Sequence, residues 1–181
     1  SQSQTGSPYE FYGKIPLRQA IPLGLQHVLA MFVGNLTPIL TLKTIIDHIK
    51  VVHPGDCISY GRDFKADHEM RIATIPIGYA DGLWRSNSHN GMVVEVEGGF
   101  APIIGRICMD QCMIDVSGIP NAGVNSKVTV YGTDGDTSVD HIAQMNDTIN
   151  YEVVCAIGER VPRVYKENGE IIAIADSITA R

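Results

Sequence analysis

The sequence predicts a mainly β, barrel-like domain with two short helices and an apolar arm at its N-terminus. Short apolar or alternating runs recur after residue 40, and Gly, Pro, Asn and Asp separate them. No strand-like run is followed by the long helix of a βαβ unit. Many short strands without that rhythm indicate an antiparallel sheet that closes toward a barrel.

Each strand is expected where such a run occurs. The alternation at 93–97 and 127–130 is typical of half-exposed strands. Asn168-Gly169 supplies the positive φ values of a tight turn, so it predicts a hairpin. The expected strands cover residues 45–52, 57–60, 71–77, 92–96, 101–107, 112–116, 127–131, 163–165 and 170–174.

Two helical segments interrupt the strands. Ser138 is placed to cap the first, with Asp140 in its first turn and Ile142 and Met145 on one face. Residues 148–157 are expected to form the second.

Composition excludes several classes of function. The 181 residues have room for one domain and an arm, and 44% hydrophobic content allows a packed core. A net charge of −6 argues against a general nucleic-acid binder, which needs a basic face. Cys108 and Cys112 form the only close cysteine pair, without the second pair or histidines of a zinc site, so no metal is expected.

The N-terminal arm differs from the rest of the chain. Residues 15–34 are nearly uncharged after Arg18, but prolines, glycine and a Gln26-His27 pair interrupt the run, so it is no clean spanning helix. The words PLGLQHVLAMFVGNLTP at 22–38 resemble the first transmembrane segment of nucleobase (uracil/xanthine) permeases. A chance apolar helix is the alternative. We therefore divide the chain into an arm, residues 1–35, and a domain, residues 36–181. A gene fusion, a truncated reading frame or an assembly artefact would each produce this pattern.

Four phrases of the domain carry chemistry: ISYG at 58–61, IGYADG at 77–82, GRICMDQ at 105–111 and TINYE at 148–152. In order and spacing they resemble the C-terminal domain of the pyridoxal 5′-phosphate (PLP)-dependent alanine racemases. The resemblance runs from about residue 37 to 164. It implies the β-barrel-like fold of that domain and the interconversion of L- and D-alanine, with D-alanine supplied to peptidoglycan.

The resemblance assigns roles to eight residues. It implies that Tyr60 is the catalytic acid or base on one face of the substrate, the other face belonging to a lysine. The alternative for Tyr60 is a strand-end aromatic whose hydroxyl is hydrogen-bonded. The resemblance further implies that the Met109 backbone N–H binds the substrate and that Asp110 lines the substrate channel. Tyr151 would contact the PLP phosphate and narrow the channel together with Tyr60. The substrate gate would consist of Tyr79, Arg85, Arg106 and Ile149.

These assignments have structural alternatives. Ile107, Met109 and Met113 could alternate into the core while the Met109 backbone still binds substrate. Arg85 could form a surface salt bridge, and Tyr79 could be a packed ring. Asp81 and Gly82 are expected to shape the backbone of their turn.

The cofactor lysine of the family is missing. It sits in a word like VKANAYGHG, and none of the six lysines lies in such a context. We therefore expect the chain alone to be inactive and to need a dimer with a complete racemase subunit. A bacterial, cytoplasmic location is expected, with membrane contact only through residues 16–34. Two alternative interpretations remain. The chain could be the serine racemase domain of a membrane-linked vancomycin-resistance protein, or a folded but inert fusion fragment or interaction module.

Overall fold

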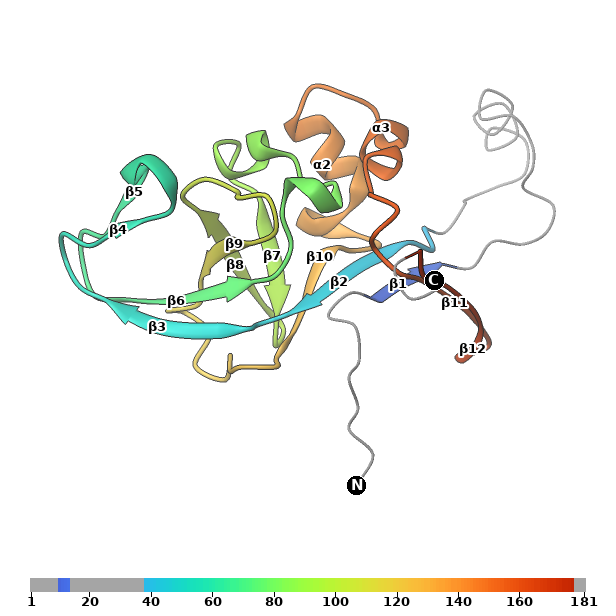
Figure 1. Cartoon of the computed structure of the whole chain (residues 1–181), viewed down its shortest axis with the longest axis horizontal. Coiled ribbons are helices and arrows are strands. Elements are labelled where there is room, and N and C mark those ends of the chain that lie inside the picture. Colours follow the sequence, from blue (N-terminus) through green and yellow to red (C-terminus); the bar gives the residue numbers. More distant parts are fainter. Residues whose placement is uncertain (1–9, 14–37, 178–181) are drawn as a thin grey trace.

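The computed structural model describes residues 10–13 and 38–177 and shows a curled, mainly antiparallel sheet with helices on one side (Figure 1). Its strand order is β12-β11-β1-β2-β10-β7-β8-β9-β6-β3, and β1–β11 is the one parallel pair among the described strands. The strands are β1 Glu10–Gly13, β2 Thr41–Ile45, β3 His48–Val52, β6 Met70–Ile75, β7 Val93–Val96, β8 Gly99–Ile104, β9 Cys112–Asp115, β10 Lys127–Tyr131, β11 Arg163–Glu167 and β12 Glu170–Ala175.

The sheet curls because the continuous segment 41–52 pairs with two different strands. β2 pairs with β10, whereas β3, two residues further on, pairs with β6. At the junction the Ile46 N–H donates to the Ser126 carbonyl at 3.0 Å, and the Asp47 N–H donates to the Thr74 carbonyl at 2.9 Å. The mainly β, barrel-like prediction is confirmed. The single strand expected at 45–52 is wrong, because the chain changes partners at 46–47.

The two expected helices are present as α2 (Val139–Met145) and α3 (Asn150–Cys155). The Ser138 hydroxyl accepts a hydrogen bond from the His141 N–H at 3.2 Å, which confirms the predicted cap. The β11–β12 hairpin is also confirmed, with φ of 51° at Asn168 and 87° at Gly169. The short elements are the hairpin β4 (Cys57–Ile58) and β5 (Phe64–Lys65), and the 3₁₀ turns η1 (Tyr60–Arg62), η2 (Tyr79–Asp81), η3 (Arg85–Ser88) and η4 (Gly135–Thr137).

Two apolar clusters hold the described part together. The larger fills the inside of the curled sheet and reaches α2 and α3 through Ile142 and Val153. The smaller lies beneath the β4–β5 hairpin, where Ile58 is buried and Phe64 packs against Met70 and its neighbours. The second cluster fixes the base of the hairpin, and the loop at its tip is η1.

Of the expected N-terminal arm, the structure describes only residues 10–13. Glu10–Gly13, from within the expected arm, forms β1 and pairs with both β2 and β11. The permease-like words at 22–37 lie outside the described residues. In the part of the chain that the structure describes, no helix is long and apolar enough to cross a membrane.

Candidate active site

Tyr60 lies at the tip of the β4–β5 hairpin, in η1. Its side chain is 73% exposed, and its hydroxyl makes no hydrogen bond with any described residue. The hydrogen-bonded strand-end alternative for Tyr60 is therefore wrong within the described part of the chain. A phenol presented in this way is open to a ligand or to a second chain.

Arg106 packs against the Tyr60 loop from the neighbouring 105–111 segment. Its Nε lies 3.1 Å from Oδ1 of Asp63, just beyond η1. A Cβ at Gly61 would lie 3.5 Å from Nη1 of Arg106, in ordinary contact. The structure thus brings Tyr60 and Arg106, two of the predicted site residues, onto one surface.

The loop carrying Met109 and Asp110 is fixed by the turn at 78–82. The Tyr79 N–H donates to the Cys108 carbonyl and the Ala80 N–H to the Met109 carbonyl, both at 3.0 Å. A Cβ at Gly78 would lie 2.3 Å from both carbonyl oxygens, so only glycine allows this approach. Tyr79, Met109 and Asp110 are therefore held next to one another through their backbones.

A buried carboxylate holds this junction from inside. Asp81 is fully buried; its Oδ2 accepts from the Gly78 N–H at 2.8 Å and its Oδ1 from Arg160 Nε at 2.7 Å. Arg160 Nη2 then donates to Oδ1 of Asp110 at 2.6 Å. Hydrogen bonds to Asp81, then to Asp110, raise the pKa of the Arg160 guanidinium above its usual value. Arg160 therefore stays charged and ties Asp110 to the interior.

Sequence reasoning placed Asp81 in a backbone-shaping role, which is confirmed, but it missed Arg160. The two residues are 79 positions apart, and no local pattern joins them. The available signal was physical: a buried carboxylate needs a cationic or hydrogen-bonding partner, so a buried Asp81 requires one from elsewhere in the chain.

The Met109 backbone is free to bind a ligand. Met109 is 52% exposed, whereas Ile107 and Met113 are buried, with exposed fractions of 1% and 9%. The alternating-core interpretation therefore fails for Met109. Its carbonyl is engaged with Ala80, but its N–H donates to no described residue. An unpaired N–H at an exposed loop suits a carboxylate.

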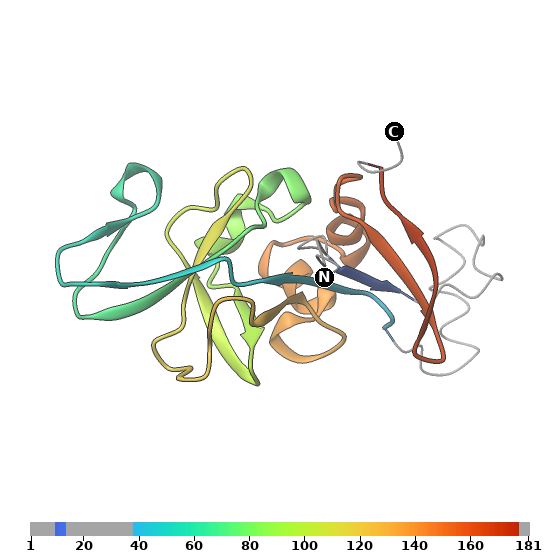
Figure 2. The ribbon, with the colours of Figure 1, turned by 60° about the horizontal axis from the view of Figure 1, so that its bottom comes forward.

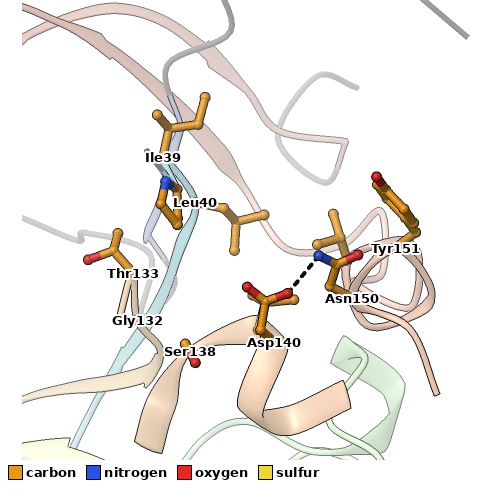
Figure 3. A pocket seen from close by; sticks show the side chains of 11 residues that line it. Ile39, Leu40, Gly132, Thr133, Ser138, Asp140, Asn150 and Tyr151 are labelled. Carbon is orange, nitrogen blue, oxygen red and sulfur yellow. Dashed lines mark hydrogen bonds between the residues drawn. The ribbon is translucent and has the colours of Figure 1, made fainter. Parts of the chain in front are cut away.

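Tyr151 and Ile149 belong to a different region, at the start of α3. Tyr151 lines a pocket of about 390 Å³ between α2, α3 and the approach to β2 (Figure 3). Figure 3 shows Tyr151 at the edge of this pocket and Asn150 pointing toward Asp140, whose Oδ1 accepts its amide at 2.7 Å. The lining contains no lysine or arginine. Ile149 is 62% exposed.

The predicted residues therefore form two groups. The first lies on the loops around Tyr60 and Met109, and the second, Ile149 and Tyr151, lies at the start of α3. In Figures 1 and 2 the β4–β5 hairpin, which carries Tyr60, projects at one end, and α3, which carries Tyr151, lies well away from it. A single chain does not bring Tyr60 and Tyr151 together.

Arg85 begins η3 and makes no ion pair with a described residue, so the salt-bridge alternative is not seen there. Tyr79 is 43% exposed and is not a fully packed ring.

The described residues contain no group of three or more His, Cys, Asp and Glu side chains that could hold a metal ion. The four cysteines are unpaired, with Cys57 and Cys155 exposed and the other two buried. Burial raises the pKa of the Cys112 thiol well above its usual value, so it is not a poised thiolate.

The described part of the chain is thus a curled, mainly β domain that exposes a tyrosine and a loop N–H. Residues 39–165 match the family described as alanine racemase, C-terminal domain, and the chain belongs to this family.

Three similar proteins illustrate the relationship. Alanine racemase 1 of Clostridium acetobutylicum is 49% identical over 146 residues, which are 80% of this chain and 38% of that protein. The solved alanine racemase of Clostridium difficile 630 superposes with a TM-score of 0.75 at 40% identity, covering 80% of this chain and 37% of that one. The alanine racemase of Bartonella henselae, solved with covalently bound PLP, gives 0.68 at 25% identity, covering 75% and 37%. The chain thus spans under two fifths of their length.

Proposed function

We propose that this chain is the tyrosine-bearing part of an alanine racemase, which interconverts L- and D-alanine once another chain supplies the cofactor lysine. The observation that carries the proposal is Tyr60, which is 73% exposed at the tip of the β4–β5 hairpin and whose hydroxyl has no hydrogen-bond partner among the described residues. The names of the relatives support alanine as the substrate.

Each residue of the first group has a task in this proposal. Tyr60 holds or accepts the proton at one face of the α-carbon through its hydroxyl. The Met109 N–H, which donates to no residue that the structure describes, binds the substrate carboxylate. Asp110, held by Arg160, lines the channel. Tyr79, Arg85 and Arg106, together with Ile149 from the region that carries Tyr151, restrict the size of the substrate that reaches Tyr60.

The cofactor would be PLP, which supplies the electron sink for loss of the α-proton when bound. The described residues do not form a complete PLP site. The pocket beside Tyr151 has no cation for a phosphate and no lysine for the aldehyde. Tyr151 fits a single contact with the phosphate, and the rest of the site must come from the lysine-bearing domain.

The separation of Tyr60 and Tyr151 supports a site built from two chains. A channel that both tyrosines narrow must take one from each of two copies of this domain, because one copy holds them apart. We therefore propose a homodimer, or a pair with a complete racemase subunit. The proposal places residues 36–181 in this domain, residues 1–35 in the arm, and the protein in the bacterial cytoplasm supplying D-alanine for peptidoglycan.

An inert fragment is the second candidate, favoured by the missing lysine context. Serine as substrate is less well supported, because the relatives are named alanine racemases.

The purified chain, mixed with PLP and L-alanine, is expected to form no D-alanine and to show no visible absorbance band of bound cofactor. The reason is that the described residues offer no lysine beside the Tyr151 pocket. A chiral assay of alanine and an absorbance spectrum check this. D-alanine formed by the chain alone would contradict the proposal that the site is incomplete.

A further inference from the structure

The backbone that leads into Tyr60 is strained. Ser59 has φ 69° and ψ 176°, a region that is essentially reserved for glycine. Gly61 and Arg62 follow with φ of 74° and 55°. Three of four successive residues thus adopt left-handed φ values. Such a conformation persists only where the surroundings hold it.

One side-chain hydrogen bond holds Ser59 in place. Its hydroxyl donates to the Arg106 carbonyl at 2.6 Å, joining segments that are 47 residues apart. Gly105 makes this approach possible, because a Cβ there would lie 2.7 Å from the Cβ of Ser59. The bond is partly buried, so water competes for it less than at the surface.

The far side of the loop is held as well. Asp63, which follows η1, pairs with the side chain of the same arginine at 3.1 Å. Arg106 therefore holds the loop at 59 through its backbone and at 63 through its guanidinium. Ile58 and Phe64 anchor the two ends of the loop in the smaller apolar cluster.

The Tyr60 side chain adds no hydrogen bond to this arrangement within the described structure. Its ring is 73% exposed and its hydroxyl is unpaired within the described structure. The direction of its side chain is therefore set by the backbone on either side of it.

We propose that Ser59 is a positioning residue for Tyr60: its hydroxyl, bonded to the Arg106 carbonyl, keeps a glycine-type backbone that aims the phenol. The inference rests on the proposed function in one respect, that Tyr60 is the catalytic tyrosine. The holding of the loop by Ser59 stands on the geometry alone.

Two substitutions separate positioning from simple stabilisation. Ser59→Ala removes the hydroxyl and keeps the strain, whereas Ser59→Gly removes both. We expect the glycine variant to melt at a higher temperature than the alanine variant. Ser177→Ala is the matched control, because its hydroxyl also donates to a backbone carbonyl, of Glu159 at 2.7 Å, far from η1 in the sequence.

The first measurement is the NMR order parameter of the Tyr60 and Gly61 N–H groups in the full chain. We expect about 0.85, the value of rigid backbone, in the unmodified chain and in Ser177→Ala. It should fall below about 0.6 in both Ser59 variants. Order parameters that stay rigid in Ser59→Ala and Ser59→Gly would overturn the proposal.

The second measurement is activity in a mixed assay. The chain is mixed with a complete alanine racemase whose own tyrosine, at the position matching Tyr60, has been replaced by phenylalanine. Misplacement of a reacting group costs up to about a hundredfold, so kcat should fall between about tenfold and a hundredfold in both Ser59 variants. KM for alanine should not change, because the Ser59 hydroxyl is bonded to the Arg106 carbonyl and is assigned no contact with the substrate.

The two measurements fail in different ways. If activity follows the melting temperature, so that Ser59→Gly is as active as the unmodified chain, Ser59 is a stabilising residue and the proposal is wrong. If the unmodified chain restores no activity, the proposed function fails, and the order parameters still decide whether Ser59 holds the loop.

Discussion

Replacement of Tyr60 by phenylalanine is expected to reduce D-alanine formation in the mixed assay by about 10²–10⁴-fold, the usual contribution of a positioned acid or base. The change removes one oxygen atom and leaves the ring in place. Because Tyr60 is 73% exposed and its hydroxyl has no partner in the described part of the chain, the free energy of unfolding should change by less than about 0.5 kcal/mol. The loss would therefore be one of chemistry.

Tyr165→Phe is the matched control for that experiment. Tyr165 lies half-buried in β11, outside the loops that carry the site, and its variant should keep the activity of the unmodified chain. Equal activity of Tyr60→Phe and Tyr165→Phe would remove Tyr60 from the catalytic role.

Arg160→Gln should lower the free energy of unfolding by about 3 kcal/mol, the low end of the cost of breaking a buried ion pair. The substitution leaves the fully buried Asp81 carboxylate without its cation. The low end applies because the Arg160 side chain is itself 37% exposed. Urea denaturation monitored by circular dichroism measures the change.

Asp110→Asn isolates the outer half of this network. It removes a charge that is 60% exposed and leaves the pair between Asp81 and Arg160 intact. An exposed ion pair contributes less than about 1 kcal/mol, so this variant should lose little stability. Equal losses in Arg160→Gln and Asp110→Asn would show that the buried carboxylate does not depend on Arg160.

Local sequence patterns predicted the elements that local interactions determine. β10 begins and ends at the bounds expected for it, 127 and 131, Ser138 caps α2, and Asn168-Gly169 turns the last hairpin. The break between β2 and β3 could not be predicted in this way. Both parts are apolar, and only their different partners, β10 and β6, separate them.

The site shows the same limit. The four motifs indicated Tyr60, Met109 and Arg106, and the structure places all three on the loops 59–63 and 105–111. The contacts that hold them were not predictable, because Ser59 meets Arg106 across 47 positions and Asp81 meets Arg160 across 79. Pairings of that length depend on the curl of the sheet, which no local window contains.

The separation of Tyr60 from Tyr151 has the same origin. The family resemblance predicts that both tyrosines narrow one channel, and the fold puts the segments that carry them at distant parts of a single chain. Both tyrosines can line one channel only if that channel lies between two chains.

Titration of the chain into the tyrosine-less racemase of the mixed assay tests that claim most directly. We predict that D-alanine formation rises with added chain until it saturates, and that addition of the Tyr60→Phe chain does not raise it. A mixture no more active than the tyrosine-less racemase alone would contradict it.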